Sequence, residues 1–245
     1  DVANLKTTAR REGDHYVVNG SKMFITSGMR ADYYTVAVRT GGPGAGGVSL
    51  LLIEREREGF ARTKLKKMGW WASDTAQLFF DNVRVPVDNL IGPENKGFIG
   101  IMLNFNQERL GMSAGAWGYA KVCLDEAIAY ARERHTFGKP LIANQVVRHR
   151  LVDMAMRINA VQSTLELLAY RVGQGEKPVA EICMLKNLAT STMEYCANEA
   201  MQIFGGAGYL RGAKVERIYR ETKVMSIGGG SVEIMKDLAA RQMGL

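Results

Sequence analysis

The sequence predicts an α+β fold in which an antiparallel β-barrel or sandwich domain is followed by an antiparallel helical bundle. Up to about residue 92, apolar runs are short and turn-forming residues separate them, whereas later apolar residues recur at the spacing of an α-helix. The 245 residues, of which 47% are hydrophobic, are enough for two domains with separate cores. We therefore expect a β domain at 1–92 and a helical domain at 93–245.

Short strands account for the first segment. The dipeptide Asn19-Gly20 lies between the apolar runs 16–18 and 23–26, and it suits the positive φ angles of a tight type I′ turn, so we expect a hairpin there. The glycine-rich stretch 41–47 is expected to form a loop. The pattern predicts about six to eight strands in total, with others at 33–38, 48–53, 76–80 and 83–85.

Helices account for the second segment. Phe98 begins an amphipathic pattern that runs to about Arg134 and stops before Gly138-Lys139-Pro140. Pro178 suits the first turn of a later helix, which ends near Gly205-Gly206. Long helices joined by short loops favour an antiparallel bundle. The expected helices lie at about 98–134, 144–172, 178–205, 214–225 and 231–242.

Composition narrows the functional class. No run of about 18 apolar residues occurs, so we expect no membrane-spanning helix and no membrane partner. Cys123, Cys183 and Cys196 form no CxxC pair, which favours reduced, buried thiols over a metal site or disulfides, in a cytoplasmic protein or, in a eukaryote, a mitochondrial-matrix one. The net charge of +7 permits nucleic-acid binding, but the two signs are interspersed, which favours a solvated surface without a nucleic-acid partner.

One glycine-rich segment is a candidate ligand site. The chain has no Rossmann or P-loop motif, but Gly228-Gly229-Gly230 precedes Ser231, a good N-cap for a helix. A helix N-terminus behind glycines can bind an anion. Taken alone, the pattern favours a simple capped turn.

Glu108 is the residue with the clearest chemical implication. It follows Ile101 and Phe105 and precedes Met112 at steps of three and four, which places it on the apolar stripe of the first long helix. A carboxylate there is expected to lose solvent and to hold a proton more readily, as a general base requires. An ion pair with Arg109 or with another buried arginine is the alternative, and the spacing favours it at least as much.

Five short motifs occur in order along the chain. They are Asp1-Val2, then 22–28 (KMFITSG), 68–75 (MGWWASDT), 132–138 (RERHTFG) and 201–209 (MQIFGGAGY). Together they resemble motifs of the acyl-CoA dehydrogenase family, in which Asp1-Val2 resembles the end of a Gly-Ser-Asp loop. Each is modest alone, but their order and spacing make the resemblance specific, and it covers essentially the whole chain.

The resemblance implies a family fold with an N-terminal helical domain, a middle β domain and a C-terminal bundle. On this basis 1–92 is an incomplete middle domain, 93–245 is the bundle, and the N-terminal helical domain is absent. The implied reaction is α-proton removal from a fatty acyl-CoA with β-hydride transfer to FAD, which gives a trans-2-enoyl-CoA. The implied electron acceptor is electron-transfer flavoprotein, and the shared flavin site implies a homodimer or homotetramer.

The resemblance also assigns cofactor contacts. Phe24 is expected to lie against the isoalloxazine ring and Thr26 to hydrogen-bond its N5 edge. The other expected contacts lie in the helical segment and reach a neighbouring subunit's FAD, where a cation and backbone donors suit the pyrophosphate. They are Arg134, Thr136, Phe137, Gln145, Gln202, Gly205, Gly206, Ser231 and Glu233.

The resemblance favours Glu108 as the catalytic base. Many members carry the base in a Tyr-Glu-Gly-Thr turn, at a position where this chain has Gly229. Long-chain and isovaleryl-type members carry it on the first bundle helix in a Glu-Arg-Leu context, which Glu108-Arg109-Leu110 resembles, and Arg109 and Asn106 are then expected near the substrate. The remaining alternatives are a non-catalytic relative that binds nucleic acid or a protein, an oxidase that passes electrons to oxygen, and an enzyme that acts on a non-CoA substrate.

Overall fold

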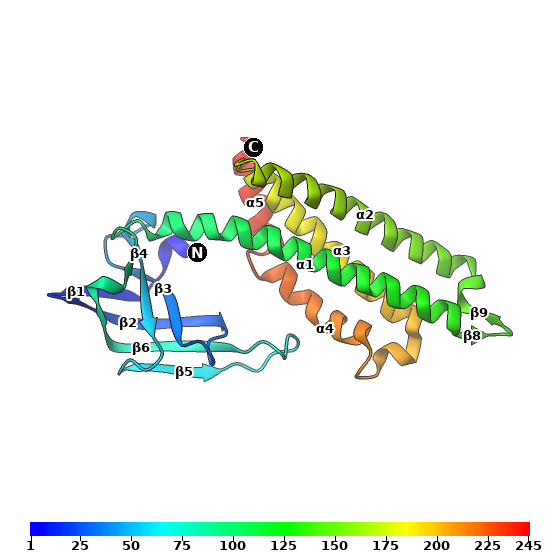
Figure 1. Cartoon of the computed structure of the whole chain (residues 1–245), viewed down its shortest axis with the longest axis horizontal. Coiled ribbons are helices and arrows are strands. Elements are labelled where there is room, and N and C mark those ends of the chain that lie inside the picture. The colour runs from blue at the N-terminus through cyan, green and yellow to red at the C-terminus, as the bar shows by residue number, and fades with distance from the viewer. The chain divides into compact units, whose positions relative to one another are not determined.

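The computed structural model describes residues 1–245 and divides into two compact units, residues 1–104 and 105–245. The first unit contains a seven-stranded sheet. Figure 1 shows strands in the first unit and long helices in the second. The predicted fold class, a β domain followed by a helical bundle, is therefore confirmed. No helix has both the length and the apolar character that crossing a membrane requires.

The sheet of the first unit is almost wholly antiparallel. Its strand order is β5-β6-β2-β1-β3-β4-β7, and β1 and β3 meet in parallel through the single pair Thr8 and Arg39. The strands are β1 (Thr8–Glu12), β2 (His15–Thr26), β3 (Tyr33–Arg39), β4 (Val48–Glu54), β5 (Phe60–Lys64), β6 (Thr75–Pro86) and β7 (Leu90–Ile91). Short 3₁₀ turns occur at Val2–Asn4, Ala45–Gly47 and Val87–Asn89.

Alternate residues of these strands form the core of the first unit. Val36 and Val38 of β3 and Leu51 and Ile53 of β4 are buried, with more exposed residues between them. This alternation is what a sheet with one face on a core requires. Phe60 joins the core through ring contacts with Tyr34 and Phe80, both at a centroid distance of 5.0 Å.

The predicted hairpin at Asn19-Gly20 is wrong, because β2 runs through this dipeptide without turning. The turn lies earlier, at Gly13-Asp14, where Gly13 has a φ of +62° and joins β1 to β2. Asn19 instead exchanges hydrogen bonds with Asn82 of β6 at 2.8 and 3.1 Å, opposite an irregularity in the β2–β6 register. Glycine is needed at position 20 for close backbone approach, because a Cβ there would lie 2.8 Å from the Thr7 Cα.

Replacing Gly20 with alanine should therefore cost more stability than the same change at the true turn. Gly20 combines a φ of +135° with the close approach to Thr7, whereas a Cβ on Gly13 would meet no atom within 4 Å. We expect Gly20→Ala to lower the free energy of unfolding by about 2–4 kcal/mol and Gly13→Ala by about 1 kcal/mol, measured by denaturant titration. Equal losses at the two positions would contradict this interpretation of the strand.

The second unit is built around α3 (Val179–Phe204), which packs against α2 (Gln145–Gly173), α4 (Lys214–Ile227) and α5 (Val232–Met243). Helix α1 (Gly97–Glu133) begins in the first unit and runs through the second. The five helices agree closely with those predicted, and Ser231 caps α5 as expected by accepting a hydrogen bond from the Ile234 amide at 3.4 Å. The remaining elements are β8 (His135–Thr136), β9 (Lys139–Pro140) and 3₁₀ turns at Leu141–Ala143 and Gly205–Tyr209.

All three cysteines are free and buried within this unit. Burial raises the pKa of the Cys123 and Cys196 thiols to about 12, so both stay protonated at neutral pH. Cys183 packs with Met235 and Ala239 between α3 and α5. These thiols therefore act as small apolar side chains of the core.

Candidate active site

The end of β2 holds two of the predicted cofactor contacts, Phe24 and Thr26. The register with β6 breaks between Lys22 and Ile25, and Phe24 has a φ of +62°, which is unusual for an aromatic residue. Its ring is 76% exposed, and Thr26 is exposed as well. The bulge thus holds an aromatic face and a hydroxyl in solvent, where a planar ligand can stack and accept a hydrogen bond.

Asp74 fixes the turn that follows β2. Its backbone carbonyl accepts a hydrogen bond from the Ser27 amide at 3.0 Å, and its carboxylate accepts one from the Met29 amide at 2.7 Å. Arg30 adds an ion pair at 3.1 Å. The Ser-Asp-Thr motif of the sequence thereby keeps the end of β2 in place next to the bulge.

Lys22 lies on the same strand and faces inward. It is the register partner of Leu78, a core residue, and antiparallel partners project to the same face of the sheet. Burial lowers the pKa of the Lys22 ammonium from 10.5 to about 8. The charged form of this side chain is therefore less stable in the folded protein than in the unfolded chain.

Lys22→Met should raise stability at neutral pH. Because the pKa of Lys22 is lower in the folded chain than the unfolded value of 10.5, its cost is full below about pH 8 and disappears as pH rises toward 10.5. We expect a gain of roughly 1–2 kcal/mol at pH 7, after allowing for solvent screening, and none near pH 10.5. Denaturant titrations at both pH values, with exposed Lys66→Met as control, test this. A gain that does not change with pH would assign the effect to packing instead.

A second group of predicted contacts gathers where α1 ends. The β8–β9 hairpin follows α1 there (Figure 1). Thr136 and Phe137 lie in this hairpin, Arg134 directly precedes it, and Gln145 is the first residue of α2. Phe137 is fully exposed with a φ of +51°, next to Gly138 at +79°. An aromatic ring held out in this way gains no burial within its own chain, so it is suited to contact with another molecule.

The end of α3 lies beside this hairpin. The rings of Tyr130 on α1 and Phe204 on α3 stack at a centroid distance of 4.2 Å, which joins the two helix ends. Gln202, Gly205 and Gly206 are exposed there. The structure therefore brings together seven of the predicted cofactor residues, namely Arg134, Thr136, Phe137, Gln145, Gln202, Gly205 and Gly206.

Ser231 and Glu233 lie elsewhere in the same unit, at the start of α5. Asn187 of α3 donates a hydrogen bond to the Val232 carbonyl at 3.0 Å, which fixes the start of α5 beside this part of α3. Fifteen residues of helix, about 22 Å, separate Asn187 from Gln202. A backbone hydrogen bond and then the Ser231 hydroxyl hold the pKa of the Glu233 carboxyl below its ordinary value. One chain therefore presents its predicted cofactor contacts in the helical unit at two separate places.

The expected burial of Glu108 is wrong, because this side chain is exposed. The buried stripe of α1 runs instead through Arg109, Ser113, Ala116 and Ala120. Small residues such as Ala116 and Ala120 allow neighbouring helices to approach closely, and they are fully buried. The larger Phe105 and Met112 are only partly buried. Helical spacing placed Glu108 beside the larger apolar side chains, but packing follows the small ones.

Arg109 has partners within its own unit. Its Nε donates to the Gly229 carbonyl at 3.1 Å, and its Nη1 donates to Asn106 Oδ1 at 3.2 Å. The guanidinium also lies 5.5 Å from the centroid of the Phe105 ring. These contacts bring Asn106, Arg109 and the glycine turn together, and Glu108 precedes Arg109 on the same helix. Direct contact of Arg109 or Asn106 with a substrate stays a prediction.

Sequence reasoning missed two further side chains at the turn. Lys186 is fully buried and its Nζ donates a hydrogen bond to the Gly230 carbonyl at 2.7 Å. Asn187 donates to the carbonyl of Val232, the first residue of α5. One signal was available, since Lys186 lies three residues from both Cys183 and Ala189 on the buried face of α3. A lysine on such a face needs a specific partner.

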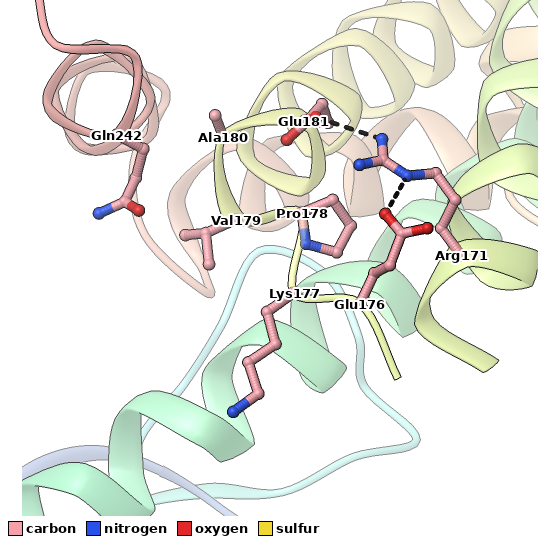
Figure 2. Close-up of a pocket in the computed structure, with 8 residues that line it drawn as sticks. All are labelled: Arg171, Glu176, Lys177, Pro178, Val179, Ala180, Glu181 and Gln242. Atoms are coloured by element: carbon pink, nitrogen blue, oxygen red, sulfur yellow. Dashed lines mark hydrogen bonds and ion pairs between the residues drawn. The ribbon is translucent and has the colours of Figure 1, made fainter. Parts of the chain in front are cut away.

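A polar pocket lies at the connection between the end of α2 and the start of α3 (Figure 2). Arg171 bridges Glu176 at 2.7 Å and Glu181 at 3.2 Å across it. None of the predicted site residues lines the pocket. Arg171 and the two glutamates that line it are paired with one another, so we interpret it as a joint between helices and not as a ligand site.

Comparison with known proteins matches both units. The family description "Acyl-CoA dehydrogenase, middle domain" matches residues 1–83, and "Acyl-CoA dehydrogenase, C-terminal domain" matches residues 95–244. The chain is 40% identical to acyl-CoA dehydrogenase AFT10-1 of Alternaria alternata, over 99% of this chain and 59% of that protein. It is 36% identical to cyclohexane-1-carbonyl-CoA dehydrogenase of Geobacter metallireducens, over 99% of this chain and 64% of that protein.

Solved structures agree with this. A probable acyl-CoA dehydrogenase from Mycobacterium abscessus is 52% identical and superposes with a TM-score of 0.98, covering 100% of this chain and 65% of that one. The chain thus spans 59–65% of the length of these relatives.

Proposed function

Because the chain belongs to the acyl-CoA dehydrogenase family, we propose that it oxidises an acyl-CoA thioester to the trans-2-enoyl-CoA with FAD as cofactor and Glu108 as catalytic base. The observation that carries the assignment of the base is the glycine turn. This turn has Gly229 where many family members carry the base, and Met112 packs against it, since a Cβ on Gly229 would lie 2.6 Å from Met112 Sδ. Glu108, one turn before Met112 on α1, is then the nearby carboxylate available for the reaction.

Exposed side chains in each of the two units suit FAD. Phe24 and Thr26 offer an aromatic face and a hydroxyl for the flavin ring, and Arg134 and the exposed glycines of the α3 end suit its pyrophosphate. Phe24 and Phe137 both adopt a positive φ and expose their rings, a costly arrangement that a bound planar group would offset. FAD, when bound, would supply the acceptor for the β-hydrogen as hydride.

In the proposed reaction, the Glu108 carboxylate removes the α-proton of the thioester. Its exposure leaves room for a substrate to approach, and an acyl-CoA covering it would remove water and strengthen it as a base. Desolvation would then come from substrate binding and not from the fold. The cationic Arg109, held next to Glu108 along the helix, would favour the negative charge that develops on the substrate.

The partners follow from the same proposal. The helical unit presents cofactor contacts at two places about 22 Å apart along α3, which fits a site shared between subunits of a homodimer or homotetramer. Electron-transfer flavoprotein is the proposed acceptor of the electrons, and a cytoplasmic or mitochondrial-matrix location is proposed with it. The substrate is an acyl-CoA whose chain length and branching stay open.

Flavin bleaching tests the proposal. The protein is prepared as this chain and as a version extended by an N-terminal helical domain of the family, and each is mixed anaerobically with octanoyl-, palmitoyl- or cyclohexane-1-carbonyl-CoA. Substrate-dependent loss of flavin absorbance is the expected result. Failure to bind flavin even in the extended form would instead favour a non-catalytic binding protein, and rapid peroxide formation in air would favour an oxidase.

A further inference from the structure

The turn between α4 and α5 is held by side chains from two other helices. Arg109 of α1 donates to the Gly229 carbonyl at 3.1 Å, and Lys186 of α3 donates to the Gly230 carbonyl at 2.7 Å. Asn187 of α3 donates to the Val232 carbonyl at 3.0 Å. We call Arg109, Lys186 and Asn187 the carbonyl clamp, because each donates a hydrogen bond to a backbone carbonyl of the segment 229–232.

The burial of two cations in this clamp is unusual. Lys186 is fully buried and Arg109 is 6% exposed. Their hydrogen-bond partners are carbonyl oxygens of the turn and an amide, which compensate a buried charge less well than a carboxylate does. Burial, and then the nearby charge of Arg109, lower the pKa of Lys186. An apolar residue would avoid this cost, so stability alone does not explain a lysine at position 186.

The backbone of the turn explains what the clamp achieves. Gly229 and Gly230 have φ angles of +67° and +108°, and without side chains they have wide conformational freedom. The side chains of Met112 and Met235 pack against Gly229 and Gly230, where Cβ atoms on these two glycines would lie. The turn is therefore also enclosed by side chains of the bundle. Hydrogen bonds to consecutive carbonyls select one conformation of a backbone that otherwise has many.

The clamp connects the turn to the proposed base. Gly229 and Gly230 are adjacent, so holding the Gly230 carbonyl restricts the positions open to the Gly229 carbonyl, which accepts the hydrogen bond from Arg109. Arg109 in turn holds Asn106 at 3.2 Å and precedes Ser113, whose hydroxyl donates to the Arg109 carbonyl at 2.8 Å. Glu108 shares this stretch of α1.

We propose that Lys186 is a positioning residue that, through the Gly229-Gly230 turn, fixes Arg109 and the segment of α1 that presents Glu108. Its catalytic consequence rests on the proposed function, whereas its effect on the turn does not. Lys186→Met keeps an unbranched chain of similar length and removes the donor. Lys186→Gln keeps a neutral donor and is the milder variant. Met193→Ala, which opens a cavity at another fully buried position of α3, is the control for general destabilisation.

Two measurements on the extended, FAD-loaded protein separate positioning from stability. Hydrogen exchange of the peptide spanning 226–234 reports the turn, and anaerobic stopped-flow flavin reduction reports chemistry at saturating acyl-CoA. We expect Lys186→Met to speed exchange in this peptide and to slow flavin reduction by about 10-fold each, with a smaller change in KM and with FAD content retained. Lys186→Gln should fall between it and the wild type, and Met193→Ala should alter neither readout.

Several outcomes would overturn the proposal. Unchanged exchange and reduction in Lys186→Met, or the same local change in Met193→Ala, would make Lys186 a purely structural residue. Where Lys186→Met fails to fold, Lys186→Gln decides by the same two readouts. A wild type that binds flavin but is not reduced by any acyl-CoA would refute the proposed function, and the exchange measurement would still decide whether Lys186 holds the turn.

Discussion

Replacing Glu108 with glutamine is expected to slow acyl-CoA-driven flavin reduction by about 10²–10⁴-fold while FAD stays bound. Glutamine has nearly the same shape and can keep hydrogen bonds, but it cannot take a proton from the α-carbon. The turn at 228–230 offers no replacement, because its three glycines carry no side-chain carboxylate. Stopped-flow reduction of the extended protein, with FAD content read from its absorbance, measures the effect.

The matched control is Glu133→Gln, which removes an exposed carboxylate at the far end of the same helix. It should reduce flavin at the wild-type rate. If Glu108→Gln bleaches as fast as the wild type, Glu108 is not the base. In that case another group abstracts the proton, and the resemblance of the Glu-Arg-Leu segment to the family motif does not identify the base of this chain.

Replacing Arg134 with glutamine is expected to weaken FAD retention by about 10–100-fold. An arginine paired with a pyrophosphate forms charge-assisted hydrogen bonds worth about 1.5–3 kcal/mol, and glutamine keeps length without charge. Arg134 is exposed beside Phe137 at the hairpin, so the change should leave the fold intact. Equilibrium dialysis or fluorescence of released flavin gives the dissociation constant.

Arg132→Gln is the control for this prediction. Arg132 is also exposed and lies in the last turn of α1, two residues before Arg134, so both changes remove the same charge from the same region. The control should retain FAD. Equal weakening by both variants would indicate a general electrostatic attraction and not a contact at Arg134, and it would be reduced by salt in both cases.

The helical unit was predictable because its signals are local. Pro178 before α3, the glycines after it and the N-cap residue Ser231 mark helix ends by conformational preferences that operate over a few residues. Periodic apolar residues specify the helices between them. The family motifs, being short contiguous segments, were equally visible in the sequence.

The sheet was less predictable because its signals are not local. Asn19-Gly20 has the composition of a turn, yet β2 continues through it since Thr7 and Asn82, distant in sequence, pack against it. Gly13 gives the turn instead. A glycine that permits close approach and a glycine that permits a turn look alike in sequence, and only the neighbouring strand distinguishes them.

The sequence by itself therefore determined the order of the elements, the ends of the helices and the family motifs that name the candidate residues. Tertiary structure alone decided which side chains the fold buries: it exposed Glu108, buried Arg109 and Lys186, and joined both cations to the carbonyls of one glycine turn. The physical reason is that burial and buried hydrogen bonds depend on how closely helices approach. That approach is set by small residues such as Ala116 and Ala120 facing other elements, and no pattern within one helix reveals it.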